Sequence, residues 1–176
     1  MGNHFRAQDL GTTVGRGEAV TCREASRWGE LGELAFVLKA ASLGITASKP
    51  FGDHRPYDFL VEHGQRLLRV QVKSVFTSPP GPGRFGFSVA VSKHLRGGKR
   101  VTYTADQIDF IVAFVAPHDA WYVIPLDAIR GRKFIRLYPG GATRSDAGRF
   151  EPYREAWHLL KDGETAPTSP SSLSRS

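Results

Sequence analysis

The chain has 176 residues, of which 40% are hydrophobic, and its net charge is +7. This length fits one domain, and the hydrophobic content is enough for a single core. No apolar stretch is long enough to span a bilayer and no signal segment begins the chain, so we expect a cytoplasmic protein. The one cysteine, Cys22, excludes an internal disulfide, and the six histidines show no spacing typical of a zinc site.

The positive charge, with a pI near 9.9, indicates a polyanionic partner. Lysine and arginine side chains bind phosphate backbones because the binding releases counterions. Charge by itself does not separate a nucleic-acid-binding protein from a basic protein without a specific partner.

Residues 1–23 mix glycine, threonine and charged residues without a period, which predicts a flexible arm before a domain over residues 24–162. Residues 25–43 follow a helical period and are apolar nearly all round, so we expect a buried helix that ends at Gly44. Glu33 stands one turn before Phe36 and Val37, and this position predicts an inward-pointing carboxylate. The alternative is that Glu33 is only a favourable acid in the first turns of the helix, a purpose that Glu30 would serve equally well.

Residues 45–51 are expected to form a first strand, followed by a β-hairpin with strands at 57–61 and 67–75 and a loop at 63–66. On the second hairpin strand, apolar residues alternate with polar ones: Leu68, Val70 and Val72 against Arg69, Gln71 and Lys73. If the loop is centred on residues 64 and 65, Asp58 lies opposite Gln71, with facing Cβ atoms about 5 Å apart.

An acid, an amide oxygen and an ammonium group would then share a small space, as in a site for a divalent cation and a phosphate. A hard cation such as Mg²⁺ prefers oxygen ligands, and a nearby lysine can orient or deprotonate the attacking water. The alternative is an ordinary amphipathic hairpin with a solvated polar face.

A proline-rich stretch at 74–83 excludes regular structure, and residues 85–91 return to strand alternation. The following loop is our candidate contact to a DNA backbone, and a solvated hairpin tip is its alternative. Its positive residues are Lys93, Arg96, Lys99 and Arg100. Arg55, which precedes the hairpin, is a further candidate for a phosphate contact.

Residues 110–116 form a continuous apolar run typical of a central strand, with 120–124 as its hairpin partner. A short helix is expected at 125–129, an edge strand at 133–138, a closing helix at 153–161 and a disordered tail at 163–176. Trp121 and Tyr122 are expected to lie one in the core and one at its edge. The predicted fold class is therefore α/β, with a central mixed sheet of about five or six strands between a long N-terminal and a shorter C-terminal helix.

The order Glu33, then Pro56-Tyr57-Asp58, then Gln71-Val72-Lys73 resembles the PD-(D/E)xK nuclease superfamily. In that superfamily a helix glutamate, a strand aspartate and a following (D/E)xK motif make the metal site. Gln71 departs from the usual acid, and a glutamine there is similar to the variant of the group I intron-encoded PD-(D/E)xK homing endonucleases. The likeness extends over residues 31–75, 103–125 and 150–160.

This resemblance implies a restriction-endonuclease-like fold and a Mg²⁺-dependent DNA endonuclease, for which Mn²⁺ is a possible substitute ion. Asp58 would be the principal metal ligand, with the Gln71 amide oxygen, the Val72 carbonyl and Glu33 completing the set. Lys73 would position or activate the water. Double-stranded DNA would be the partner, and a homodimer or homotetramer would cut its two strands. The neutral Gln71 removes one negative charge and should weaken metal affinity.

Three other functions remain open from the sequence. A Holliday-junction-resolvase-like nuclease would cut four-way junctions better than linear duplex. A nucleic-acid-binding module of the same fold would bind DNA without cleaving it. A basic RNA-associated protein without an active site would prefer RNA.

Overall fold

The computed structural model describes residues 22–52, 54–78, 86–95, 97–141 and 148–161. The predicted tail at 163–176, most of the predicted arm at 1–23, the proline cluster at 79–83 and Arg96 lie outside these residues. Within the described part of the chain, no helix is long and apolar enough to cross a membrane.

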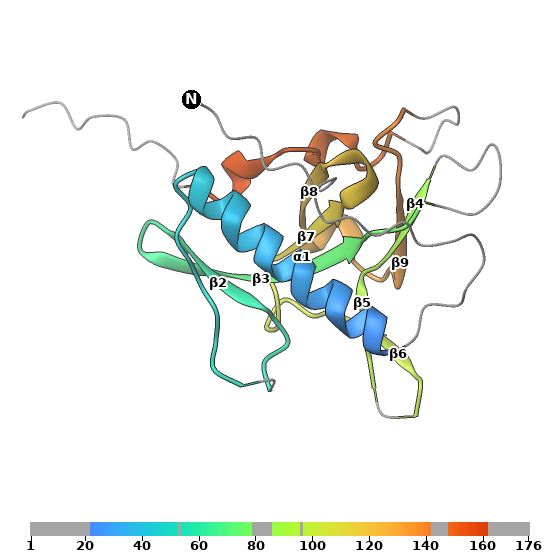
Figure 1. The fold of residues 1–176 in the computed structure, drawn as a ribbon. Helices are drawn as coiled ribbons and strands as arrows, with labels where there is room; N and C mark the ends of the chain where they lie inside the picture. The colour runs from blue at the N-terminus through green and yellow to red at the C-terminus, as the bar shows by residue number, and fades with distance from the viewer. Residues whose placement is uncertain (1–21, 53, 79–85, 96, 142–147, 162–176) are drawn as a thin grey trace, which may run out of the picture.

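A five-stranded mixed sheet forms the centre of the molecule (Figure 1). Its spatial order is β1 (Ala47–Ser48), β2 (Phe59–His63), β3 (Arg66–Val75), β7 (Phe110–Val115) and β8 (Ala120–Pro125). The central pair, β3 and β7, is parallel, and the other neighbours are antiparallel. The predicted mixed sheet is confirmed.

The predicted hairpin register is also confirmed. Phe59 pairs with Val70 and His63 with Arg66, around a tight turn in which Gly64 has φ +60°. Asp58 lies one residue before β2, and its backbone N–H donates to the Val70 carbonyl at 2.9 Å. The pairing therefore sets Asp58 against Gln71.

The remaining strands of the described residues form two small antiparallel sheets. One joins β4 (Phe87–Ala90) to β9 (Phe134–Leu137), and the other joins β5 (Ser92–His94) to β6 (Arg100–Thr102). The segment predicted as an edge strand at 133–138 thus pairs with β4 instead of extending the central sheet. The basic loop becomes the tip of the β5–β6 hairpin, where Gly97 and Gly98 both have positive φ.

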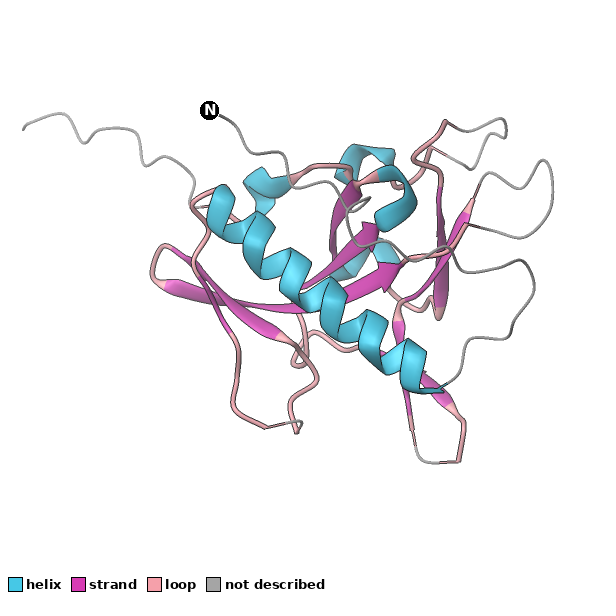
Figure 2. Ribbon diagram, in the orientation of Figure 1, coloured by secondary structure: helices cyan, strands magenta, loops and turns pink. Residues whose placement is uncertain are grey.

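One long helix, α1 (Cys22–Ser42), lies across one face of the sheet (Figure 2). The prediction that it is buried all round is wrong. Phe36 and Ala40 are buried, whereas Leu34 is 67% and Leu38 52% exposed. A helix that lies on a sheet covers only one stripe of its surface, so the second apolar stripe faces outward.

The first strand is much shorter than predicted, with two residues in place of residues 45–51. Pro50 has no N–H to donate to a ladder, and Gly52 at φ +81° turns the chain away from the sheet. The expected helix at 125–129 forms as the 3₁₀ helix η3 (Leu126–Ile129), and a further 3₁₀ turn, η2 (Ala116–His118), joins β7 to β8.

The predicted closing α-helix at 153–161 is wrong. Two 3₁₀ turns, η4 (Glu151–Tyr153) and η5 (Trp157–Leu159), stand in this region. Between them Glu155 adopts φ +49°, a left-handed conformation that interrupts a right-handed helix. The Glu155 carboxylate instead accepts two hydrogen bonds. One comes from the backbone N–H of Trp121 near the start of β8 (2.9 Å), and the other comes from the indole N–H of Trp157 (2.8 Å).

A hydrophobic core lies on each face of the central sheet. The core under α1 includes Phe36, Phe59, Val70, Val112, Phe114, Trp121 and Trp157. The core on the opposite face includes Phe87, Tyr103, Ile111, Ala113, Tyr122 and Leu137. Strand β7 supplies alternate side chains to both cores, which explains its continuous apolar sequence.

Adjacent aromatic residues on β8 serve both cores. Trp121 stacks on Phe114 with ring centroids 4.2 Å apart, and Tyr122 enters the opposite core. Both side chains are buried, so the expectation that one lies at the core edge is wrong.

Candidate active site

The candidate site forms where β2 leaves the edge of β3. Beyond the pairing of Phe59 with Val70, the peptide groups of Val72 have no β2 partner strand and face the side chain of Asp58. The Val72 N–H donates to Asp58 Oδ2 at 2.8 Å. The Val72 carbonyl accepts a hydrogen bond from Gln71 Nε2 at 3.3 Å. The end of the hairpin ladder therefore brings backbone and side-chain oxygens to one place.

Gln71 is a buried member of this site, with only 8% of its surface exposed. Its Nε2 donates to Asp58 Oδ2, and its Oε1 accepts a hydrogen bond from the hydroxyl of Tyr103 at 3.3 Å. Because Gln71 is buried and both ends of its amide have hydrogen-bond partners, Gln71 does not belong to a solvated hairpin face. That alternative reading of the polar side chains is excluded for this residue.

Helix α1 brings Glu33 to the same site. Gly32 makes the close approach possible, because a Cβ built there would lie 2.5 Å from Ser74 Oγ on β3. Ser74 Oγ in turn donates to the carbonyl of Trp28 at 3.0 Å. Glu33 is half-buried and binds Lys49 Nζ at 2.6 Å. Glu30, the alternative acid, is exposed.

The electrostatics of Asp58 reflect its burial among charges. Burial raises the pKa of Asp58 to about 6, and the neighbouring carboxylate of Glu33 acts in the same direction. The Val72 N–H and the ammonium groups of Lys73 and Lys49 oppose this rise. A carboxylate pair in a poorly solvated site favours the arrival of a cation.

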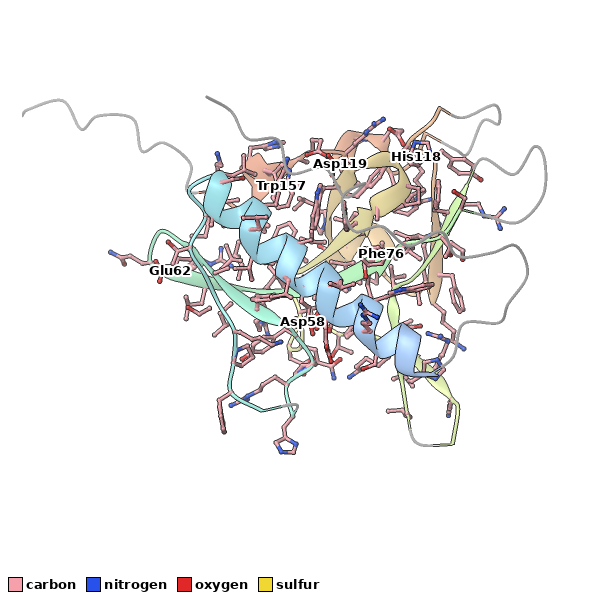
Figure 3. The ribbon with its side chains drawn as sticks, viewed as in Figure 1. Asp58, Glu62, Phe76, His118, Asp119 and Trp157 are labelled. Atoms are coloured by element: carbon pink, nitrogen blue, oxygen red, sulfur yellow. The ribbon has the colours of Figure 1, made fainter. Side chains whose placement is uncertain are left out.

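Lys73 lies half-buried on β3, two residues after Gln71. Burial lowers its pKa, and the positive charge of Arg100 acts in the same direction, while Asp58 and Glu33 oppose the shift. A lysine with a depressed pKa is more easily deprotonated and can take part in proton transfer. The four predicted residues, Glu33, Asp58, Gln71 and Lys73, thus come together from α1 and from both sides of the hairpin. Figure 3 labels Asp58 near the middle of the molecule.

A comparison with protein families supplies the decisive observation. The model of the PD-(D/E)XK endonuclease family matches residues 24–160, which is most of the chain. The chain belongs to this PD-(D/E)XK endonuclease family. It is therefore a nuclease, as the resemblance predicted.

One solved structure supports this membership in detail. The bacterial homing endonuclease I-Ssp6803I is 31% identical to this PD-(D/E)XK endonuclease with a TM-score of 0.63, covering 77% of this chain and 91% of that one. MepB (11% identity, TM-score 0.40) covers 68% of this chain and 94% of its own. The Holliday junction resolvase Hjc from Archaeoglobus fulgidus (16% identity, TM-score 0.40) covers 69% and 94%. No curated protein matches the chain.

Endonucleases of this family generally use divalent metal ions, and the donor groups here fit a hard cation. The Asp58 carboxylate, the Val72 carbonyl and the half-buried Glu33 are oxygen donors. In the described part of the chain, no group of three or more His, Cys, Asp or Glu side chains lies close enough to hold a metal. A cation at this PD-(D/E)XK site would therefore depend on backbone, amide and phosphate oxygens in addition to two carboxylates.

The predicted DNA-contacting residues fall into two groups, those that are exposed and those whose side chains contact other residues of the protein. Arg55 and Lys99 are exposed. Lys93 instead donates to Gln107 Oε1 at 2.7 Å, and Arg100 lies over the Phe134 ring at 4.8 Å from its centroid. The connection between β1 and β2, which carries Arg55, and the β5–β6 hairpin project from the same side of the molecule (Figure 1).

Sequence reasoning missed two residues of the site, Tyr103 and Lys49. Neither belongs to a motif, and each reaches the site only through the packing of a distant segment. Lys49 follows β1 directly and lies two residues after Ala47, so strand alternation places both on the same side of the chain. This was a weak signal that Lys49 lies near Glu33. We find no sequence signal that singles out Tyr103.

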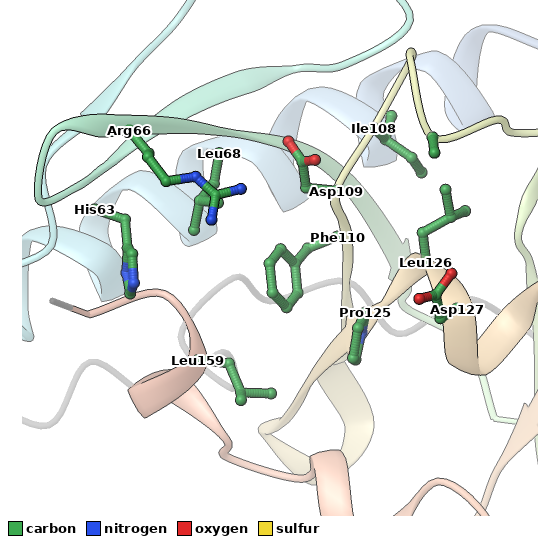
Figure 4. Close-up of a pocket in the computed structure, with 11 residues that line it drawn as sticks. His63, Arg66, Leu68, Ile108, Asp109, Phe110, Pro125, Leu126, Asp127 and Leu159 are labelled. Atoms are coloured by element: carbon green, nitrogen blue, oxygen red, sulfur yellow. The ribbon is translucent and has the colours of Figure 1, made fainter. Parts of the chain in front are cut away.

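A separate pocket lies at the other end of the β3–β7 pair, away from this site (Figure 4). It has a volume of about 350 Å³ and is lined by residues including His63, Arg66, Asp109, Phe110 and Leu159. None of the four predicted catalytic residues lines it. Asp109 here binds Arg69 through two oxygens, at 3.0 Å and 2.9 Å, which is a structural link between β3 and β7.

Proposed function

We propose that this nuclease is a Mg²⁺-dependent, site-specific DNA endonuclease of the homing type, with Mn²⁺ as a possible substitute ion. The observation that carries the proposal is the meeting of Asp58, Gln71, Lys73 and Glu33 where β2 leaves β3. The 31% identity to a bacterial homing endonuclease supports the homing type and the DNA substrate. We place the protein in the cytoplasm, together with its substrate.

In this proposal the residues of the chain have distinct roles. Asp58 is the principal metal ligand, with the Val72 carbonyl and the amide oxygen of Gln71 beside it, and Glu33 acts through a water or a second ion. A bound divalent cation neutralises charge on the scissile phosphate and promotes ionisation of water. Lys73, with its lowered pKa, orients the water for in-line attack and takes or shares its proton.

A cleavage assay on plasmid DNA with Mg²⁺, Mn²⁺ or chelator tests these roles. We expect Asp58→Ala to abolish cleavage and Lys73→Ala to reduce its rate by about 10²–10⁴-fold. The matched controls are Asp127→Ala and Lys161→Ala, which remove an exposed acid at the separate pocket and an exposed lysine after η5. Cleavage by the Asp58→Ala protein at the parent rate, or cleavage in chelator, would refute the proposal.

Substrate choice separates the proposed activity from its rivals. A degenerate duplex library should yield a defined cleaved sequence, whereas preferential cutting of four-way junctions would indicate a resolvase. DNA binding without cleavage in any divalent ion would indicate a binding module, and better binding of RNA than of duplex DNA would exclude both nuclease types.

We propose that the basic residues of the two projecting segments bind the DNA backbone. Arg55 and Lys99 are exposed and free to approach a phosphate, and Lys93 and Arg100 add charge nearer the site. Arg96 belongs to the same proposed set. Lys99→Ala should weaken binding uniformly across sequences and reduce the slope of log K against log salt by about 1. An unchanged slope in this variant, equal to that of Lys161→Ala, would exclude Lys99 as a contact.

Cutting both strands requires two sites, and we propose a homodimer or homotetramer. The outer stripe of α1 exposes Leu34, Val37 and Leu38, an apolar surface that a second copy would cover. Light scattering should give the mass of at least two chains. Leu38→Glu should shift that mass toward one chain, and a monomeric parent would refute the assembly.

A further inference from the structure

Tyr103 lies against the candidate site from outside the hairpin and α1. It follows β6 directly and is 8% exposed in the core opposite α1. Lys93 Nζ lies 5.6 Å from the centroid of its ring, and the same ammonium donates to Gln107. The Tyr103 hydroxyl can both donate and accept a hydrogen bond.

The amide of Gln71 is held between Tyr103 and Asp58 with a definite polarity. Its N–H end faces Asp58, and its oxygen faces the hydroxyl of Tyr103. A carboxylate accepts hydrogen bonds, so this orientation satisfies both groups when Asp58 is charged. A cation, however, requires the oxygen end of the amide. The orientation of Gln71 in the structure is therefore the reverse of the one that a metal ligand needs.

A half-turn of the amide about its terminal bond converts one orientation into the other. The oxygen then faces the position beside Asp58, and the N–H end faces Tyr103. An amide buried to this extent must keep a partner at both ends, because an unpaired buried polar group destabilises the fold. A tyrosine hydroxyl can rotate from donor to acceptor, whereas a phenylalanine ring offers neither.

We propose that Tyr103 is a positioning residue that satisfies the Gln71 amide in both orientations. It thereby lets Gln71 exchange its hydrogen bond to Asp58 for a bond to a divalent cation. This inference rests on the proposed function, because it takes the cation to bind beside Asp58. It assigns Tyr103 no contact with the substrate or with the cation.

The test measures cation binding and the Gln71 amide, and it does not depend on cleavage. In protein labelled with ¹⁵N at glutamine side chains, Gln71→Glu identifies the Gln71 NH₂ signals by their loss. We expect Mg²⁺ to move these signals in the parent protein. Calorimetry with Mg²⁺ and with Mn²⁺ should show that Tyr103→Phe weakens cation binding by about 10–100-fold, as for other groups that orient metal ligands.

The matched control is Tyr122→Phe, which also removes a buried hydroxyl, here one that donates to Glu151 at 2.8 Å away from the site. We expect its cation affinity to equal that of the parent. Equal affinities for Tyr103→Phe and the parent would overturn the inference, and so would Gln71 signals that Mg²⁺ leaves in place. The NMR measurement on the parent can still refute the exchange at Gln71 if Tyr103→Phe does not fold.

The failure of this inference differs from the failure of the proposed function. If the parent binds the cation and cleaves DNA while the Gln71 amide stays fixed, only the exchange is wrong, and Gln71 acts as a hydrogen-bond donor to Asp58. If the parent binds neither Mg²⁺ nor Mn²⁺ in the presence of duplex DNA, the proposed function and the exchange are both refuted.

Discussion

The contact between Gly32 on α1 and Ser74 on β3 offers a sharp test of how the helix is positioned. A methyl group at residue 32 would lie 2.5 Å from Ser74 Oγ and 2.6 Å from Ser74 Cβ, so strand or helix must move. Alanine gains about 1 kcal/mol of helix propensity over glycine. Overpacking of this kind costs about 1–3 kcal/mol, so we expect Gly32→Ala to destabilise the protein by about 0–2 kcal/mol.

Gly29 on the same helix is the matched control. A Cβ there meets no atom within 4 Å, so Gly29→Ala should gain the propensity, about 1 kcal/mol, without the clash. The two variants should therefore differ by about 1–3 kcal/mol. With a urea m-value of about 2 kcal/mol/M, their unfolding midpoints should lie about 0.5–1.5 M apart.

The experiment is urea unfolding followed by circular dichroism, with cleavage measured on the same proteins. Adding Ser74→Gly to Gly32→Ala removes both clashing atoms and should close much of the gap, apart from the lost hydrogen bond to Trp28. Because Glu33 follows Gly32, a shifted helix should also reduce cleavage. If Gly32→Ala is as stable as Gly29→Ala, the close helix–strand packing inferred here is wrong.

Three further changes have expected outcomes. The pKa of Asp58 is raised to about 6, so its contribution to the stability of the cation-free protein is full below about pH 4 and is lost as the pH rises through about 6. In chelator, urea unfolding should show the parent losing up to about 3 kcal/mol of stability relative to Asp58→Asn across that pH range. A difference that stays constant with pH would contradict this. Burial raises the pKa of Asp109, but the hydrogen bonds from Arg69 outweigh it and hold the pKa below its usual value. Stability relative to Asp109→Asn should therefore be full above about pH 4 and fall in more acid solution, and an opposite slope would exclude the pair as its cause. Trp157→Ala should lower the free energy of unfolding by about 3–5 kcal/mol, because the indole is buried beside Phe36, and a loss below 1 kcal/mol in calorimetry would show that the C-terminal turns are dispensable.

The parts of the fold that could be predicted are those fixed by local pattern. The hairpin register follows from a short loop around Gly64 and from alternation along β3, and both are readable in the sequence. The continuous apolar run of β7 likewise identified a strand buried on both faces. Because the register places Asp58 against Gln71, the pairing at the centre of the site was predictable.

The errors occur where tertiary context overrides local pattern. Residues 153–161 have helix-compatible composition, but Glu155 is committed to the backbone of β8 and to Trp157, and this interaction holds a non-helical turn. The apolar outer stripe of α1 indicated burial, yet one sheet covers only one side of a helix. Periodicity along the sequence does not encode which distant segment a residue will bind. It also does not encode which side of a helix a sheet will cover.

By itself, the sequence determined the hairpin, its register and the juxtaposition of Asp58, Gln71 and Lys73, because neighbours along a strand and across a tight turn are fixed by backbone geometry. Only the tertiary structure decided that Glu33 comes near Asp58, on a helix that approaches β3 closely at Gly32, and that Tyr103 and Lys49 join the site. These contacts connect segments far apart in the chain, and their distances depend on how the whole core packs.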